Sequence, residues 1–226
     1  MFDSPFVRRV AISMKCLGLD FEHRNWSVGK DFELIRQFNP LGRVPTLVLP
    51  EGEVLIESIA ILDFLDELAG PARALLPPSG TSRRTALRMM GIATGAAEKG
   101  VSEIYETAFR PLEKRHGPWV ERCRTQVYAA LAELDRLCEA RSTPWLIGDR
   151  MAQPDITLAC VFTFLVEALA VEGSAEVYPG LAQLTARCEA LPEFRSVKAD
   201  WFRPQERVDA SSDARPRDPL DPRRRG

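Results

Sequence analysis

The pattern of hydrophobic and polar positions changes near residue 80. Before that point helical and strand-like periods alternate. The predicted elements are a helix, a strand, a second helix, a two-stranded hairpin and a third helix, at 5–17, 21–26, 31–38, 46–49 with 54–56, and 57–68. Ser4 precedes the first helix, Pro5 is its first residue and Gly18 follows it, which is typical of a capped helix. This part of the chain is predicted to be a small α/β unit.

The rest of the chain reads as helical. Residues 71–83 are rich in Pro and Gly and are expected to form a linker. The following apolar periods predict helices at about 84–110, 119–140, 154–171, 178–190 and 192–200. We therefore expect an α/β domain over 1–70, an all-helical domain over 84–203 and a disordered tail of Arg, Asp, Pro and Ser over 204–226.

Charge and hydropathy exclude several functions. Lys and Arg number 30 against 32 Asp and Glu, a net charge of -2, so neither nucleic acid nor a membrane surface is an expected partner. No apolar run reaches the roughly 18 residues of a spanning helix, and residues 1–20 do not read as a signal peptide. We expect a cytoplasmic protein.

The sequence has few residues that could form a metal site or the catalytic triad of a hydrolase. The only histidines are His23, in the predicted strand, and His116, in a predicted loop, and we expect neither to be catalytic. The cysteines are scattered with no CxxC pair, so no metal site is expected and the thiols should be reduced and mostly buried: Cys16, Cys123, Cys138, Cys160 and Cys188.

Four local motifs, in this order, resemble the glutathione transferase superfamily, particularly its bacterial members. They are Ser4-Pro5-Phe6-Val7-Arg8-Arg9, Asn39-Pro40-Leu41-Gly42-Arg43-Val44-Pro45-Thr46-Leu47, Glu57-Ser58, and Gly148-Asp149 to Asp155-Ile156-Thr157. The resemblance covers about residues 1–200. It implies a thioredoxin-like glutathione-binding domain, a helical-bundle domain, glutathione as co-substrate without a metal, and a homodimer.

The resemblance assigns glutathione contacts to five residues. Val44-Pro45 would be a cis peptide that pairs the tripeptide backbone, although Val-Pro alone reads as a trans proline at a strand start. Glu57 and Ser58 would hold the γ-glutamyl end, or act only as a helix cap. Arg43 would reach the glycyl carboxylate, or be a solvated loop cation.

Ser4 is the candidate catalytic residue. A hydroxyl at the start of a helix can donate to a bound thiolate and stabilise it, so the nucleophile would be the sulfur of glutathione. The alternative is a plain helix N-cap. We interpret Arg8 and Arg9 mainly as surface or domain-contact residues.

The second domain offers weaker signals. Asp155 keeps half of a helix capping box whose hydroxyl position is occupied by Ala152, and we interpret this segment as structural. The acceptor pocket should lie between the start of the first helix and the opening helices of the second domain. Four aromatic residues fall in that stretch, but such spacing more often marks core: Tyr105, Phe109, His116 and Trp119.

One departure concerns the N-terminus. The family usually has an interior strand before the Ser-Pro helix, and here only Met1-Phe2-Asp3 precede Ser4. We expect Met1 to be an internal methionine, because losing an interior strand would leave its neighbours unpaired.

Three functions follow. The first is a transferase that adds glutathione to a small electrophile. The second is a non-catalytic binding or assembly module, and the third is a glutathione-dependent reductase or peroxidase.

Overall fold

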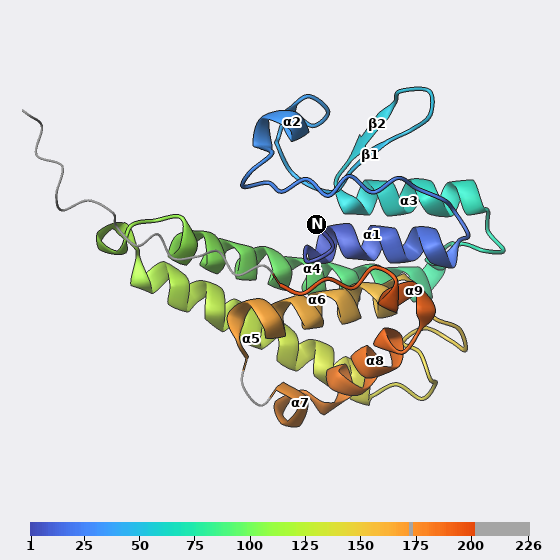
Figure 1. The fold of residues 1–226 in the computed structure, drawn as a ribbon. Helices are drawn as coiled ribbons and strands as arrows, with labels where there is room; N and C mark the ends of the chain where they lie inside the picture. The colour runs from blue at the N-terminus through green and yellow to red at the C-terminus, as the bar shows by residue number, and fades with distance from the viewer. Residues whose placement is uncertain (172–173, 202–226) are drawn as a thin grey trace, which may run out of the picture.

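The computed structural model describes residues 1–171 and 174–201, which form an α/β unit packed on a helical unit (Figure 1). In chain order the elements are α1 (Pro5–Cys16), α2 (Phe32–Arg36), β1 (Thr46–Val48), β2 (Val54–Ile56), α3 (Ser58–Ala69), α4 (Gly80–Ala108), the 3-10 helix η1 (Leu112–Lys114), α5 (Gly117–Glu139), α6 (Gln153–Leu169), α7 (Ser174–Val177), α8 (Pro179–Glu189) and α9 (Pro192–Arg195). The predicted order of an α/β unit followed by a helical one is confirmed. The tail expected over 204–226 lies outside the described residues.

The predicted strand over 21–26 is wrong. In the described part of the chain the sheet consists of β1 and β2 alone, an antiparallel hairpin in which Leu47 faces Leu55. Residues 21–26 instead run back along α1 and α3 (Figure 1). Phe21 packs on both hydrophobic clusters, but residues 22–25 are all exposed, so burial does not alternate along the segment. Within the described residues no neighbouring strand pairs with its backbone. Residues 1–4 also form no strand.

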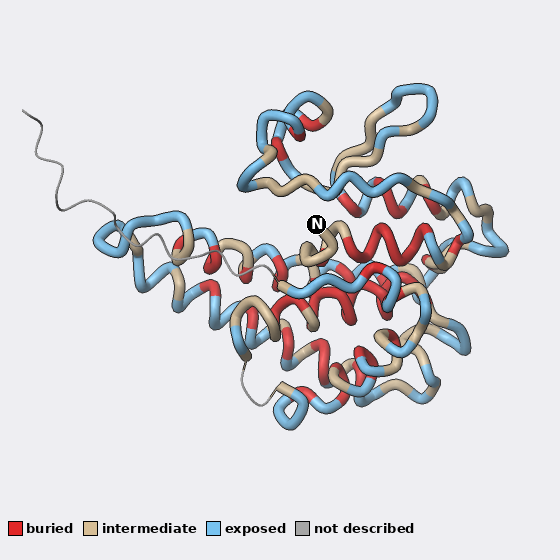
Figure 2. The backbone as a smooth tube through the Cα atoms, in the orientation of Figure 1, coloured by how far each residue is buried: buried red, intermediate tan, exposed pale blue. Residues whose placement is uncertain are grey.

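Helix α1 lies between the two units and is buried on most of its surface (Figure 2). Val10 and Met14 belong to a small cluster shared with α3. Ala11 and Ile12 face the other way, into the large core of the helical unit. Because one helix contributes to both cores, the two units cannot be separated without exposing apolar surface on each.

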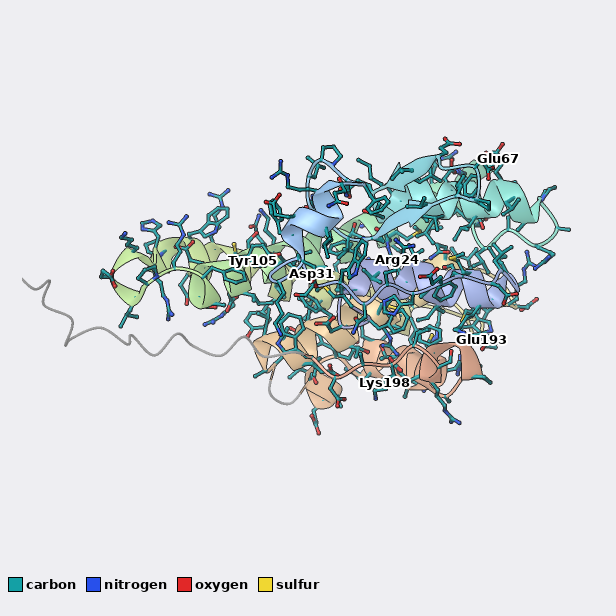
Figure 3. All side chains as sticks on the ribbon, turned by 45° about the horizontal axis from the view of Figure 1, so that its top comes forward. Arg24, Asp31, Glu67, Tyr105, Glu193 and Lys198 are labelled. Carbon is teal, nitrogen blue, oxygen red and sulfur yellow. The ribbon has the colours of Figure 1, made fainter. Side chains whose placement is uncertain are left out.

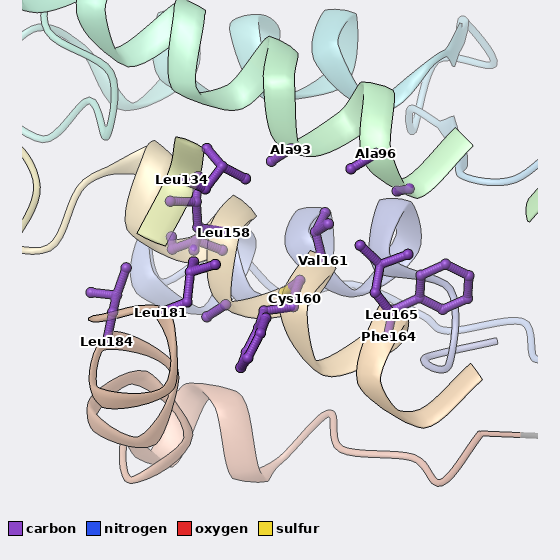
Figure 4. Packing of buried hydrophobic residues seen from close by; sticks show 14 of the residues in the cluster. Ala93, Ala96, Leu134, Leu158, Cys160, Val161, Phe164, Leu165, Leu181 and Leu184 are labelled. Carbon is purple, nitrogen blue, oxygen red and sulfur yellow. The ribbon is translucent and has the colours of Figure 1, made fainter. Parts of the chain in front are cut away.

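The large core is built where α1, α4 and α8 pack on α6, and α5 packs on α4 and α8 (Figure 4). Small residues of α4, Ala93 and Ala96, face the larger Val161 and Leu165 of α6. A Cβ atom added at Gly100 would lie 2.6 Å from a methyl carbon of Leu165. The absence of a side chain at Gly100 therefore lets α4 approach α6 closely.

The connection between the units is held by hydrogen bonds. The Asp66 carboxylate, on α3, accepts from the backbone N–H groups of Leu75 and Leu76 at 2.7 and 2.9 Å. The carbonyl of Leu75 in turn accepts from the N–H of Gln153 at the start of α6. The segment before α4 is thus fixed to both units.

Helix α6 begins as its motif predicts. The buried Asp155 carboxylate accepts from the N–H of Ala152 and from the N–H of Leu146, each at 2.9 Å. Ala152 has no hydroxyl with which to complete the capping box. Burial raises the pKa of Asp155, and its backbone hydrogen bonds oppose that rise.

The cysteines are unpaired, and all except the partly exposed Cys16 are buried. Within the described residues, no helix has both the length and the apolar character to cross a bilayer. The same residues hold no group of three or more His, Cys, Asp or Glu side chains placed to ligate a metal.

Replacing the α6 cap should destabilise the protein. Asp155→Ala removes the acceptor of two buried backbone N–H groups, and we expect it to lower the free energy of unfolding by about 3 kcal/mol. Denaturant titration measures this value. The exposed Asp149, in the same loop, supplies the control: Asp149→Ala should change stability by less than about 0.5 kcal/mol. Equal effects of the two substitutions would contradict the role given to Asp155.

Candidate functional site

Helices α1 and α3 begin at the same end of the α/β unit (Figure 1). A hydrogen bond fixes this arrangement: the Arg9 guanidinium, in the second turn of α1, donates to Oγ of Ser58, the first residue of α3, at 2.6 Å. The positive ends of two helix dipoles therefore point to one region, which favours an anionic ligand there.

Ser4 is the residue before α1, and its backbone is extended, with φ -75° and ψ 124°. Its side chain does not cap the helix, although the residue type and position suit a cap. Within the described residues its hydroxyl makes no hydrogen bond, and the first-turn N–H groups of Phe6 and Val7 are also unpartnered. The start of α1 thus presents three free donors.

The expected cis peptide between Val44 and Pro45 is confirmed. It lies just before β1, and neither the N–H nor the C=O of Val44 is hydrogen-bonded within the described residues. Both polar groups of one residue are therefore available to an extended peptide.

The loop that carries this peptide is organised by Asn39, which is 1% exposed. Its amide nitrogen donates to the carbonyl of Arg43 at 2.9 Å and to Oγ1 of Thr46 at 3.2 Å, and its amide oxygen accepts from the N–H of Leu41. Gly42 has φ 61°, and a Cβ there would lie 2.1 Å from the ring of Phe32. The conformation of this loop therefore depends on Asn39 and Gly42.

Glu57 and Arg43 are brought together. Glu57, directly before α3, has φ 66°, a left-handed conformation that is unfavourable for a residue with a side chain. Its carboxylate lies 3.5 Å from one nitrogen of Arg43, and another nitrogen of Arg43 lies 3.8 Å from Glu98 on α4. All three side chains are about half exposed, so these ion pairs are weak and open to competition from a ligand.

Arg8 and Arg9 are not surface residues. Both are buried, and both contact the helical unit: Arg8 binds Glu189 with two hydrogen bonds, and Arg9 lies 3.4 Å from Oγ1 of Thr157. The domain-contact interpretation is confirmed and the surface interpretation is wrong. An amphipathic helix exposes charges at such positions, whereas α1 is covered on both sides.

Comparison with known proteins identifies the family. Residues 1–73 match the family described as glutathione S-transferase, N-terminal domain, and residues 117–187 match its C-terminal domain. A solved glutathione S-transferase from Methylobacterium radiotolerans, in complex with glutathione sulfonate, is 32% identical with a TM-score of 0.79, over 91% of this chain and 95% of that one. The chain belongs to the glutathione transferase superfamily.

Two further relatives have 25% and 31% sequence identity to this chain. A glutathione S-transferase from Methylobacillus flagellatus, solved with glutathione bound, is 25% identical with a TM-score of 0.80, over 88% of this chain and 96% of that one. The uncharacterized GST-like protein YibF of Escherichia coli is 31% identical over 59% of this chain. The match spans 65% of the length of YibF.

The four aromatic residues considered for the acceptor pocket are not core residues. Tyr105 and Phe109 are 47% and 61% exposed and contact each other edge to face near the tip of the α4–α5 hairpin. Figure 3 labels Tyr105 on the part of α4 that runs past α2. Trp119 is also exposed, and the N–H of His116 donates to Glu106. The core interpretation is wrong: these residues occupy exposed positions of the α4–α5 hairpin, while Ile104 on the same part of α4 faces the core.

Sequence reasoning missed three contributions to the site. Asn39 lay inside a recognised motif but received no role, and its short polar side chain next to Pro40 was a turn signal. Glu98 reaches Arg43 from the other domain, and no sequence signal marks such a contact. Arg9 joins the two helix starts, and its only signal was a second Arg in the Ser-Pro motif.

The loop before β1 should depend on Asn39. We expect Asn39→Ala to lower the free energy of unfolding by about 2 kcal/mol, because the Leu41 N–H and the Arg43 carbonyl lose their buried partner. Thermal and denaturant unfolding measure the change. Gln37→Ala, at an exposed position two residues earlier, is the control and should be nearly neutral. A neutral Asn39→Ala variant would refute the organising role.

Proposed function

We propose that this protein is a glutathione transferase, which activates the thiol of bound glutathione for attack on a small electrophile. One observation carries the proposal: α1 and α3 begin together, and the start of α1 presents a free Ser4 hydroxyl and free N–H groups. An ionised thiol and a carboxylate are the groups that such positions stabilise. The glutathione sulfonate and the glutathione bound in the solved structures of two relatives support this choice of ligand.

The proposed binding mode uses each part of the site once. The N–H and C=O of Val44 would pair with the cysteinyl unit of glutathione. The N-terminus of α3 at Ser58 would take the γ-glutamyl carboxylate, and Glu57 would accept from the neighbouring ammonium. Arg43 would exchange its weak pairing with Glu98 for the glycyl carboxylate.

The proposed chemistry needs no basic side chain. The free thiol, with a pKa of about 8.5, is mostly protonated at neutral pH. The Ser4 O–H and the first turn of α1 would stabilise the thiolate, so the proton leaves to water before reaction. The sulfur then donates an electron pair to the electrophilic carbon, and the leaving group departs with the electrons of the broken bond. Ser4 forms no bond to the substrate.

The alternatives differ in what they require. A reductase or peroxidase reaction more often uses Cys at the position of Ser4, and Cys16 is no substitute because burial raises its pKa to about 12. A non-catalytic module would bind glutathione without turnover or not bind it at all. Binding followed by turnover measurements separates it from the transferase.

Ser4→Ala tests the proposal directly. We expect the pKa of the bound thiol, followed by ultraviolet absorbance of the thiolate across pH, to lie well below about 8.5 in the wild type and to rise towards that value in the variant. Calorimetry on the same samples measures glutathione affinity.

Ser79→Ala is the matched control, because Ser79 also precedes a helix, α4, without capping it. It should leave the thiol pKa unchanged. Absence of glutathione binding in the wild type, or an equal thiol pKa in wild type and Ser4→Ala, would contradict the proposed role of Ser4.

We further propose a homodimer. Ile59 and Leu87, exposed apolar side chains of α3 and α4, border a hollow of about 270 Å³ whose wall includes the buried Met90. An exposed apolar hollow formed by both domains supports an interface there.

Light scattering on the eluting protein should give twice the 25.3 kDa of one chain. Leu87→Glu should shift the mass towards one chain by placing a charge in the interface. Leu112→Glu, at an exposed apolar residue near the hairpin tip, should not. A monomeric wild type would rule the dimer out.

A further inference from the structure

Arg9 is a buried cation with no carboxylate partner. Its residue is 2% exposed, and its guanidinium donates to Oγ of Ser58 from Nε at 3.2 Å and from Nη2 at 2.6 Å. A third donor, Nη1, lies 3.4 Å from Oγ1 of Thr157 on α6. Within the described residues no carboxylate lies in ion-pair distance of it. Burial lowers the pKa of Arg9 to about 10, so the group remains charged at neutral pH.

The neighbouring Arg8 is paired with a carboxylate, as buried arginines usually are. Arg8 is also buried, and it forms a two-point pair with the Glu189 carboxylate at 2.6 and 2.7 Å. A buried cation without such a partner is destabilising, because its lost hydration is only partly replaced. Contacts to two neutral hydroxyls are weaker compensation. We therefore expect the charge of Arg9 to have a function other than packing.

The contacts of Arg9 determine what the Ser58 hydroxyl can do. A serine hydroxyl has two lone pairs and one hydrogen. Arg9 directs two N–H groups at the oxygen, and within the described residues the hydroxyl hydrogen has no acceptor. The first-turn N–H groups of Ser58 and Ile59 are likewise unpartnered there. The groups that remain free at the start of α3 are therefore hydrogen-bond donors.

We propose that Arg9 is a positioning residue that holds Ser58 as a hydrogen-bond donor and places a positive charge behind it, so that the start of α3 selects the γ-glutamyl α-carboxylate. This inference rests on the proposed function. Arg9 touches no ligand in this scheme and acts through the Ser58 oxygen. Its contact with Thr157 connects the same subsite to the helical domain.

The test compares glutathione with γ-aminobutyryl-cysteinylglycine, the tripeptide that lacks only the α-carboxylate. Calorimetry should show that the wild type prefers glutathione. Arg9→Met should weaken glutathione binding by about tenfold or more, because one charge and one oriented donor are lost, while affinity for the analogue changes by less than about twofold. An equal loss for both peptides would show a merely structural role and overturn the proposal.

The control for burial is Arg8→Met/Glu189→Gln, which removes the adjacent buried pair without touching Ser58. It should preserve the preference for glutathione. Thermal unfolding of every variant checks that the fold is retained.

A cycle with Arg9→Lys and Ser58→Ala keeps the proposal testable if Arg9→Met does not fold. Lysine retains the charge but lacks the two-pronged geometry, so Arg9→Lys should weaken glutathione binding on its own and have no further effect on Ser58→Ala. Additive losses would overturn the proposal. A wild type that binds glutathione while Arg9→Lys binds it equally well overturns this inference alone. A wild type that binds neither peptide overturns the proposed function and this inference together.

Discussion

The burial of α1 on two sides is the constraint on which the rest of the structure depends. Eight of its twelve residues are buried, and its apolar side chains divide between the core shared with α3 and the core of the helical domain. A helix in this position has little solvent-exposed surface on which charged side chains can lie. Arg8 and Arg9 must therefore find partners inside the protein, and the side-chain partners they find belong to α8, α3 and α6. The same helix fixes both the domain arrangement and the start of the site.

Local signals predicted most elements and the region of the site. The caps and apolar periods located the main helices, and the motif around Val44-Pro45 predicted the cis bond that Val-Pro alone does not. Failures occurred where distant partners decide the outcome. Residues 21–26 alternate as a strand does, but a strand requires a neighbour, and alternation carries no information about one.

The same reason explains the misplaced side chains. Arginine is seldom buried, so the sequence left a surface position and a domain contact both open for Arg9, and only the packing of two other helices on α1 decides between them. Tyr105 and Phe109 were expected in the core because aromatic residues usually are, yet the α4–α5 hairpin extends beyond its covering helices. Ser4 has the residue type and position of an N-cap, but the sequence does not predict the orientation of its hydroxyl, which makes no cap hydrogen bond.

Very little of the site consists of titratable side chains. Its donors are backbone N–H groups at two helix starts, the hydroxyls of Ser4 and Ser58 and the backbone of Val44, while Arg43, Glu57 and Glu98 form an exposed charged rim. Oriented dipoles of this kind keep their charge at every pH and need no reorganisation when an anion arrives. Their placement depends on the loop that Asn39 holds and on the contact between α1 and α3.

The fixed connection before α4 bears on how a ligand enters. A hinge needs residues that are free to change φ and ψ, but Leu75 and Leu76 are bound to Asp66 on one side, and Leu75 also to Gln153 on the other. Rotation of one domain against the other would break these bonds and separate α1 from one of its cores. An anion entering the site would therefore meet local side-chain contacts at the rim, among them the weak pair of Arg43 and Glu98, and its approach would depend on ionic strength.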